Sequence, residues 1–186
     1  MNDSIVLWFV IAMVLFWAMG AYNRLVRLRS QGIVAFAVLE GLFNQWVSLV
    51  KTHSPQANSA ESVVEASQAQ DEAARAWMGL VAATEQFSAS LKVAHGRPLH
   101  GPTTSALTTA LDTLCLSWSR LRDLPSDLAG PALPGPLLSQ WEHVAFQVEI
   151  ARTEFNRQVN NYNEAIRQFP ALLLAWLFGF KPAQPI

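Results

Sequence analysis

Side chains that could perform acid–base or metal chemistry are sparse in this 186-residue chain and do not follow a catalytic spacing. The four histidines are His53, His95, His100 and His143. They lack the spacing of a zinc site, and the nearest approach to a di-iron motif, Glu142 followed by His143, has the wrong spacing. The sequence contains no G-x-S-x-G motif, no phosphate-binding glycine loop and no H-E-x-x-H motif. We therefore expect a protein that is not an enzyme and that uses no metal, cofactor or small-molecule substrate.

Cys115 is the only cysteine, so no intramolecular disulfide can form. It lies in the apolar stretch LDTLCLSWSRL without an evident activating base, and we expect a small buried hydrophobic side chain there. Arg152 interrupts a run of apolar positions. It either pairs with Glu149 or Glu65 or extends its charged end into solvent, and we favour the second.

Three asparagines repeat at 4,3 spacing, Asn156, Asn160 and Asn163, which places them on one face of a helix. Asparagine is a mediocre helix former, so the repetition indicates hydrogen bonding between helices, with an exposed polar face as the alternative. We expect Tyr-Asn pairs of the first and fourth helices to meet. The residues assigned to this pairing are Tyr22, Asn23, Asn156, Tyr162 and Asn163.

The composition excludes some classes of partner. Half of the chain is apolar (51%), and the net charge is −1. A neutral chain offers no electrostatic basis for nucleic-acid binding, so we expect none.

Residues 5–22 read IVLWFVIAMVLFWAMGAY and carry no charge, which predicts a single transmembrane helix. A cleaved signal peptide is the alternative, but the residues before the segment are MNDS and include no basic residue. Basic residues follow the apolar run, which predicts an outward-facing N-terminus and a cytoplasmic remainder. The residues expected to flank the membrane are Trp17, Tyr22, Arg24, Arg27 and Arg29.

Downstream, apolar residues recur at 3,4 spacing in four segments, which predicts helices over about 22–53, 58–94, 103–123 and 136–169. Similar lengths and short connections favour an all-α, up-down-up-down four-helix bundle. The expected organisation is residues 1–22 as the outer N-terminus and membrane helix, 23–169 as the cytoplasmic bundle and 170–186 as an apolar tail. Expected start signals are Asn58 with Glu61, Thr103 or Thr104, and Pro136.

The tail sequence FPALLLAWLFGFKP is too short to span a bilayer. Four antiparallel helices return the chain to the membrane surface, where Pro170 ends the last one. The tail then either makes a shallow second membrane contact or folds onto the open end of the bundle. The residues assigned to it are Phe169, Pro170, Trp176, Leu177, Phe178, Gly179, Phe180 and Lys181.

Two stretches resemble the LemA family: YNRLVRLR at 22–29 and FNRQVNNYNEAIRQFPALLLAWLFGFKP at 155–182. The second is similar to the family signature of YN pairs, an FP pair and LFGFK. Positions 35–51 depart from the pattern that the family usually has after the first stretch, with Phe36 where the family has Trp and Asn44-Gln45 where the family has a basic pair. The resemblance implies a bacterial protein with one N-terminal membrane helix, a helical cytoplasmic domain and no assigned enzymatic activity.

These observations together predict a scaffold or adaptor at the bacterial inner membrane. Its expected partners are the lipid bilayer and another membrane protein. A self-assembling, homo-oligomeric membrane-surface protein is the alternative. In either case Trp46, Trp77 and Trp118 fall on the apolar faces as core anchors.

Overall fold

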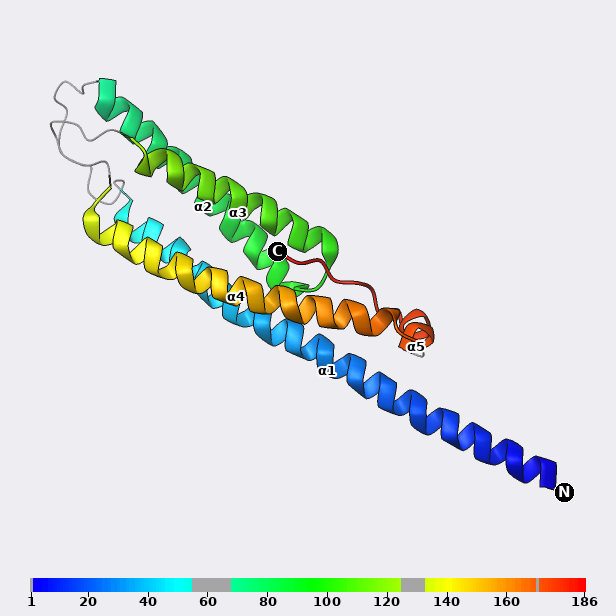
Figure 1. Cartoon of the computed structure of the whole chain (residues 1–186). Helices are drawn as coiled ribbons and strands as arrows, with labels where there is room; N and C mark the ends of the chain where they lie inside the picture. The colour runs from blue at the N-terminus through cyan, green and yellow to red at the C-terminus, as the bar shows by residue number, and fades with distance from the viewer. Residues whose placement is uncertain (1, 55–67, 125–132, 170) are drawn as a thin grey trace.

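The computed structural model describes residues 2–54, 68–124, 133–169 and 171–186. Within these ranges the chain forms helices and no strand, which confirms the all-α prediction. The helices are α1 (Asn2–His53), α2 (Gln68–Gly96), α3 (Gly101–Arg122), α4 (Gly135–Arg167) and α5 (Ala171–Phe178). Figure 1 shows the N-terminal part of α1 extending alone beyond the other helices.

The long helices associate as two pairs. α1 packs along α4 and α2 along α3, and the pairs meet chiefly where α1 contacts α2. As residue numbers rise along α1 they fall along the partner, so α1 and α4 are antiparallel. The ring contacts that show this are Trp17–Phe169, Phe36–Phe155 and Trp46–Trp141.

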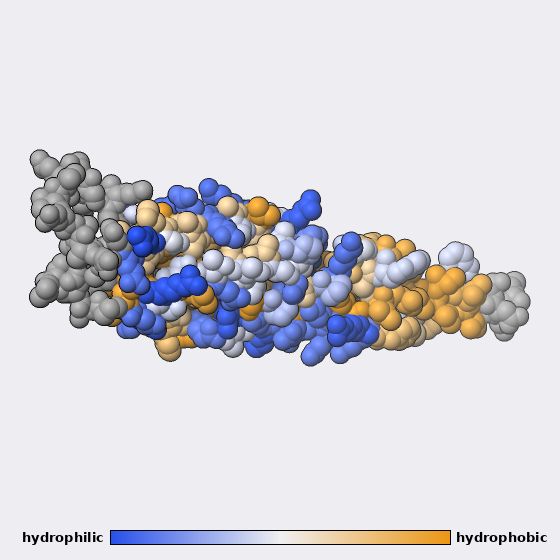
Figure 2. Space-filling model, turned by 90° about the horizontal axis from the view of Figure 1, so that it is seen from above, coloured by the Kyte–Doolittle hydropathy of each residue, from blue (hydrophilic) through white to orange (hydrophobic). Residues whose placement is uncertain are grey.

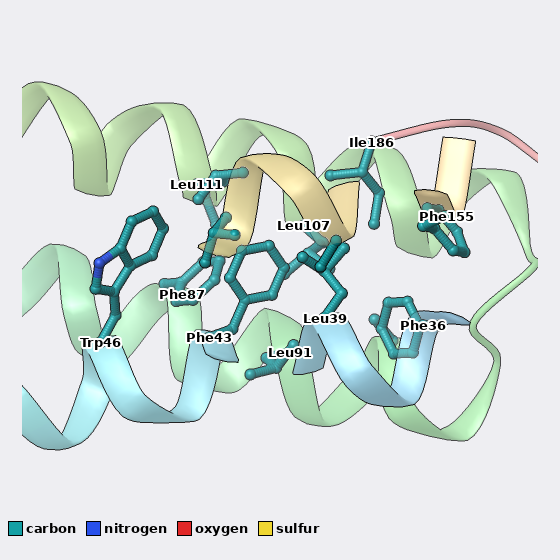
Figure 3. Packing of buried hydrophobic residues seen from close by; sticks show 14 of the residues in the cluster. Phe36, Leu39, Phe43, Trp46, Phe87, Leu91, Leu107, Leu111, Phe155 and Ile186 are labelled. Atoms are coloured by element: carbon teal, nitrogen blue, oxygen red, sulfur yellow. The ribbon is translucent and has the colours of Figure 1, made fainter. Parts of the chain in front are cut away.

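A stack of three indole rings joins three helices in the core. Trp141 of α4 lies between Trp46 of α1, at a centroid distance of 4.7 Å, and Trp118 of α3, at 4.0 Å. All three are buried, and the Trp46 indole N–H donates to the Trp141 carbonyl at 3.5 Å. Further along, Phe43 meets Phe87 edge-to-face (Figure 3). The stack therefore ties α3 to the α1–α4 pair.

Buried positions agree with the 3,4 spacing throughout α3, where the apolar positions of the repeat are all buried: Leu107, Leu111, Leu114, Trp118 and Leu121. In α1 every second position of the repeat is buried, namely Leu25, Gly32, Leu39 and Trp46, whereas the intervening Ala35 and Leu42 are only partly buried. Phe36 and Phe43, each one residue further on, are buried instead, so the buried face of α1 is turned partly toward its larger aromatic residues. Phe36 packs against Phe155, with ring centroids 5.7 Å apart.

Helix starts differ from the expected ones. The Asn58–Glu61 signal lies outside the described residues, and α2 is described from Gln68. The N-cap of α3 is His100, so Thr103 and Thr104 already lie within the helix and neither is its cap. The Thr103 hydroxyl lies within hydrogen-bond distance of the Arg97 and His100 carbonyls. Pro136 lies in the first turn of α4, as expected.

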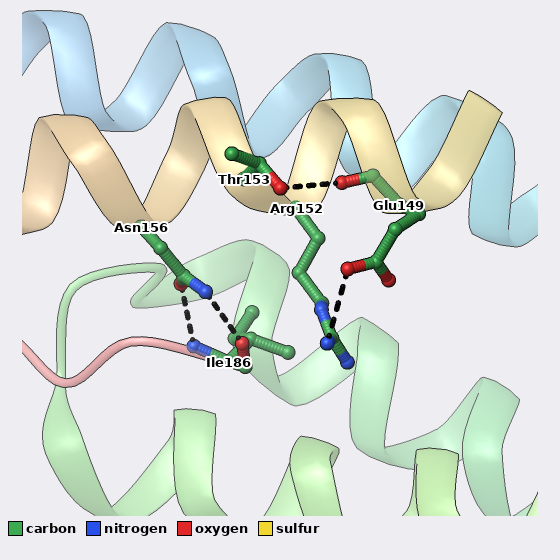
Figure 4. Close-up of polar contacts among 5 residues, drawn as sticks. All are labelled: Glu149, Arg152, Thr153, Asn156 and Ile186. Carbon is green, nitrogen blue, oxygen red and sulfur yellow. Dashed lines mark hydrogen bonds and ion pairs between the residues drawn. The ribbon is translucent and has the colours of Figure 1, made fainter. Parts of the chain in front are cut away.

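Two side chains are placed differently from their predictions. Cys115 is exposed, because it follows the buried Leu114 by one residue and points away from the core. Arg152 does not extend freely into solvent: its guanidinium lies 3.4 Å from the Glu149 carboxylate in a partly exposed ion pair (Figure 4). Glu65, the other expected partner, lies outside the described residues.

Candidate functional site at the junction of α1 and α5

The N-terminal part of α1 presents apolar side chains to the surroundings on all sides. An 18-residue window of this helix has a mean hydropathy of 2.2 and is not buried at all, so by length and composition the helix could cross a membrane. Figure 2 shows this hydrophobic surface gathered toward one end of a molecule that is otherwise largely hydrophilic. Arg24, Arg27 and Arg29 follow it and are all exposed.

Helix α5 adds a second apolar surface beside the first. Ala171 and Ala175 face inward, since residues four apart share a face and small side chains allow close approach. The larger side chains point outward, and the Trp176 side chain is 84% exposed. The other exposed apolar residues here are Phe169, Leu172, Leu173, Leu177 and Phe178. In Figure 1, α5 is viewed nearly end-on while α1 lies across the picture, so α5 runs crosswise to α1.

Aromatic contacts fasten α5 and its flanks to α1. Trp17 meets Phe169 at a centroid distance of 5.7 Å. One turn further along α1, Tyr22 meets Phe178 at 5.1 Å and Phe180 at 6.1 Å. Residues at the end of the apolar α1 segment therefore hold both ends of α5, which places the two exposed apolar surfaces side by side.

Helix α5 is followed by Gly179, whose backbone adopts the left-handed conformation. Its φ of 70° is the only positive φ among the described residues, and the Phe180 N–H donates to the Ala175 carbonyl at 2.9 Å. This six-residue bond around a left-handed glycine is the Schellman motif. The glycine of the LFGFK sequence thus reverses the chain, so that residues 179–186, the C-terminal segment, run back along α4 (Figure 1).

Two asparagines of α4 bind the backbone of the C-terminal segment. Asn163 donates to the Ala183 carbonyl and accepts from the Ala183 N–H, both at 2.8 Å. Asn156 does the same for Ile186, at 2.8 and 2.9 Å (Figure 4). Seven helical residues advance about 10.5 Å, and three extended residues cover about 10 Å, so the two spacings match. Each amide thus takes the place of a neighbouring strand.

Further contacts complete this attachment. The Tyr162 hydroxyl donates to the Lys181 carbonyl at 3.1 Å, and the Ser105 hydroxyl of α3 donates to the Gln184 side chain at 2.8 Å. The side chains of Ala183 and Ile186 are buried, and Ile186 points into the core (Figure 3). Burial raises the pKa of Tyr162, although the nearby charge of Arg29 opposes the shift, so this hydroxyl stays protonated and able to donate.

The Tyr-Asn residues therefore have different partners from those predicted. Asn156, Tyr162 and Asn163 bind the C-terminal segment rather than α1, and Asn23 is exposed. The physical reason is that the backbone N–H and carbonyl groups of a non-helical segment lack partners within their own segment and need the α4 side chains, whereas the exposed Asn23 side chain can bond to water. Of the two alternatives for the tail, the structure shows that residues 179–186 fold onto the helices. Helix α5 faces outward, and its contact with a membrane stays a prediction. Pro170 lies outside the described residues.

The side chains that could bind a metal ion are dispersed over the described part of the chain. No three His, Cys, Asp or Glu side chains there are close enough to share an ion. The ion pair between His95 and Glu40, at 2.9 Å, links α2 to α1 and raises the pKa of His95.

Comparison with known proteins bears on the same C-terminal half. The model of the LemA family matches residues 102–185, which include α3, α4, α5 and nearly all of the C-terminal segment. Searches of the curated proteins and of the solved structures gave no significant match.

Proposed function

Residues 102–185 make this chain a LemA family protein, and on that premise we propose a non-catalytic, membrane-anchored helical scaffold. In this proposal α1 spans the bilayer and α5 lies in its surface as a second attachment. The two helix pairs then act as one antiparallel four-helix unit that is held at a set distance from the membrane.

The observation that carries the proposal is the ring contact of Tyr22 with Phe178 and Phe180. Residues 5–22 span about 27 Å as a helix, close to the hydrocarbon thickness of a bilayer. α5 is attached at the end of that length and runs across α1, the orientation of a helix that lies in the membrane plane. Its outward Trp176 and Leu177 would otherwise be exposed to water.

A fluorescence experiment on the full chain tests the second attachment. In a Cys115→Ser background, an environment-sensitive dye is attached to Trp176→Cys, and the protein is reconstituted in phosphatidylcholine vesicles. We expect a blue-shifted emission that spin-labelled lipids quench. The matched control is Met78→Cys, because Met78 is also an exposed apolar residue but lies on α2, far along the chain from α5. Equal, water-like emission at both positions would contradict the proposed attachment.

We infer the orientation from the basic cluster that follows the apolar segment. Arg24, Arg27 and Arg29 favour the cytoplasmic side, so the N-terminus faces outward and the helical domain lies in the cytoplasm of a bacterial cell. An alkaline phosphatase fused after Ile186 is then expected to be inactive. Full phosphatase activity would reverse the orientation.

Exposed apolar residues on the helical domain support a protein partner. Val34 and Val38 of α1, and Phe146 and Ile150 of α4, are more than half exposed and are spaced four apart on their helices. Such surfaces fit either another membrane protein or a second copy of this chain. Light scattering of the purified protein in mild detergent separates the two. A single copy per micelle supports the scaffold, whereas a large homogeneous particle that Val38→Glu and Ile150→Glu dissolve supports self-assembly.

A further inference from the structure

A groove of about 760 Å³ lies directly below α5, on the side of the helical domain. Its walls come from α1, the end of α2 with its connection to α3, α4, and the end of α5 with the C-terminal segment. Tyr22, Phe178 and Phe180 form its apolar end, where the proposed membrane surface begins.

The polar part of the groove is basic. Arg29, Arg97 and Lys181 line it together with His95 and His100, and no acidic residue is among the lining residues. None of the ion pairs within the described ranges involves Arg29, Arg97 or Lys181. The three cations therefore share one cavity without a carboxylate partner, an arrangement that favours an anion.

The backbone that carries these cations is held in place. The Lys181 carbonyl accepts from Tyr162, and the Arg97 carbonyl accepts from Thr103. Gly32 allows the α2–α3 connection to approach α1, because a Cβ at this position would lie 3.3 Å from Leu99. The cations are thus brought together by the fold, and they come from positions 29, 97 and 181 of the sequence.

Arg29 lies just beyond the expected headgroup layer. Residue 29 is about 10 Å past the apolar segment along α1, whereas the polar region on one side of a bilayer is about 5–8 Å thick, so the long Arg29 side chain can reach the headgroups. An anion at this height beside an apolar helix has the chemistry of a phospholipid: a phosphate with acyl chains toward α5.

We propose that the groove below α5 binds the phosphate of an anionic phospholipid, with Arg29, Arg97 and Lys181 as its cationic contacts. This inference rests on the proposed membrane attachment. It adds a selectivity for anionic headgroups that attachment through apolar residues alone does not require.

Lipid retention in detergent micelles tests the proposal separately from attachment to a bilayer. The full chain in dodecylmaltoside is titrated with dioctanoyl phosphatidylglycerol or dioctanoyl phosphatidylcholine, and bound lipid is counted by native mass spectrometry. We expect phosphatidylglycerol to bind and phosphatidylcholine not to. Because each basic residue near an anionic surface strengthens binding by about fivefold, Arg97→Gln with Lys181→Gln should weaken binding by about 30-fold.

The matched control removes the same charge elsewhere. Lys51→Gln with Arg120→Gln changes two exposed cations outside the groove and should alter phosphatidylglycerol binding by less than about twofold. Equal loss in both double variants, or no loss in the groove variant, would overturn the proposal. Far-UV circular dichroism verifies folding, and the single variants Arg97→Gln and Lys181→Gln should each give about a fivefold loss.

A third arm separates the lipid from free phosphate. Inorganic phosphate at the concentration of the lipid should leave phosphatidylglycerol binding unchanged, and equal displacement would overturn the lipid assignment. If the dye at position 176 shows no membrane contact while the micelle titration succeeds, the second attachment fails and the headgroup site stands. If instead the dye reports membrane contact and the micelle titration fails, the second attachment stands and only the headgroup site is refuted.

Discussion

The side-chain amide of Asn163 and the backbone of Ala183 exchange two hydrogen bonds of 2.8 Å, one in each direction. The side chain of a helix residue thereby supplies the donor and the acceptor that a neighbouring strand would supply. Its partner, Ala183, lies 20 residues further along the chain. Because Ala183 follows the turn at Gly179, this pair fixes the path of the chain after α5.

Replacing Asn163 by Ala should destabilise the protein by about 1–3 kcal/mol, because both backbone groups of the buried Ala183 lose their partner. Asn163→Asp should also destabilise it, since the carboxylate keeps the bond from the N–H but faces the carbonyl oxygen. Hydrogen exchange of the Ala183 amide and thermal unfolding measure the effect. Asn160→Ala, at an exposed position of the same helix, is the control and should change stability by less than about 0.5 kcal/mol. Equal effects at both positions would contradict the assigned role of Asn163.

Replacing Gly179 by Ala should cost about 1 kcal/mol because of the positive φ alone, since no atom lies within 4 Å of the added Cβ. Asn should be tolerated better than Ala, because it visits the left-handed region more readily. The control is Gly41→Ala, within α1 and with equally open space, which should instead stabilise the protein by about 0.5–1 kcal/mol. Changes of opposite sign in the thermal unfolding temperature of the two variants would confirm the prediction, and changes of the same sign would refute it.

The central ring of the tryptophan stack should be the most costly of the seven indoles to remove. Trp141→Ala deletes both ring contacts and leaves a cavity, with an expected loss of about 3–5 kcal/mol in the free energy of unfolding. The near-ultraviolet circular dichroism should weaken as well. Trp176→Ala, at an 84% exposed position, is the comparison and should cost less than about 0.5 kcal/mol in detergent. A Trp141→Ala variant as stable as Trp176→Ala would show that the stack contributes little.

Cys115 should react slowly with alkylating reagents at neutral pH. Its side chain is exposed and reachable, but desolvation by the surrounding protein raises the pKa of the thiol, and Asp112 raises it further against the opposing charge of Arg152. Because the thiolate is the reactive form, the rate should rise with pH, with a midpoint above that of free cysteine. Asp112→Asn should lower the midpoint and Arg152→Gln should raise it. A midpoint at or below that of free cysteine would contradict the assigned environment.

Much of the helical architecture follows from the sequence. The 3,4 spacing of apolar residues marks α3 and α4 to within one or two residues at all four of their ends, because an amphipathic helix must turn one face inward. The same reasoning finds only part of the buried face of α1: Leu25, Leu39 and Trp46 are buried, but Phe36 and Phe43 are buried in place of the neighbouring Ala35 and Leu42. Cys115 is misplaced for a related reason, since a single residue separates it from the buried face of α3.

The asparagines of α4 illustrate what local pattern leaves open. Their 4,3 spacing indicates a hydrogen-bonding face, but an amide can donate and accept, so it pairs equally well with another side chain or with a backbone. The choice depends on where residues 183 and 186 lie, and the turn at Gly179 decides that.

The amino-acid sequence alone determined the helices, the apolar segment of membrane-spanning length and the presence of a second apolar stretch near residue 175, since each depends on neighbouring residues. Only the tertiary structure decided that α5 lies beside Tyr22, that Asn156 and Asn163 bind the C-terminal segment, and that three distant cations line one groove. These relationships join positions far apart in the chain, and their partners are selected by packing and by unsatisfied backbone groups, which no local pattern records.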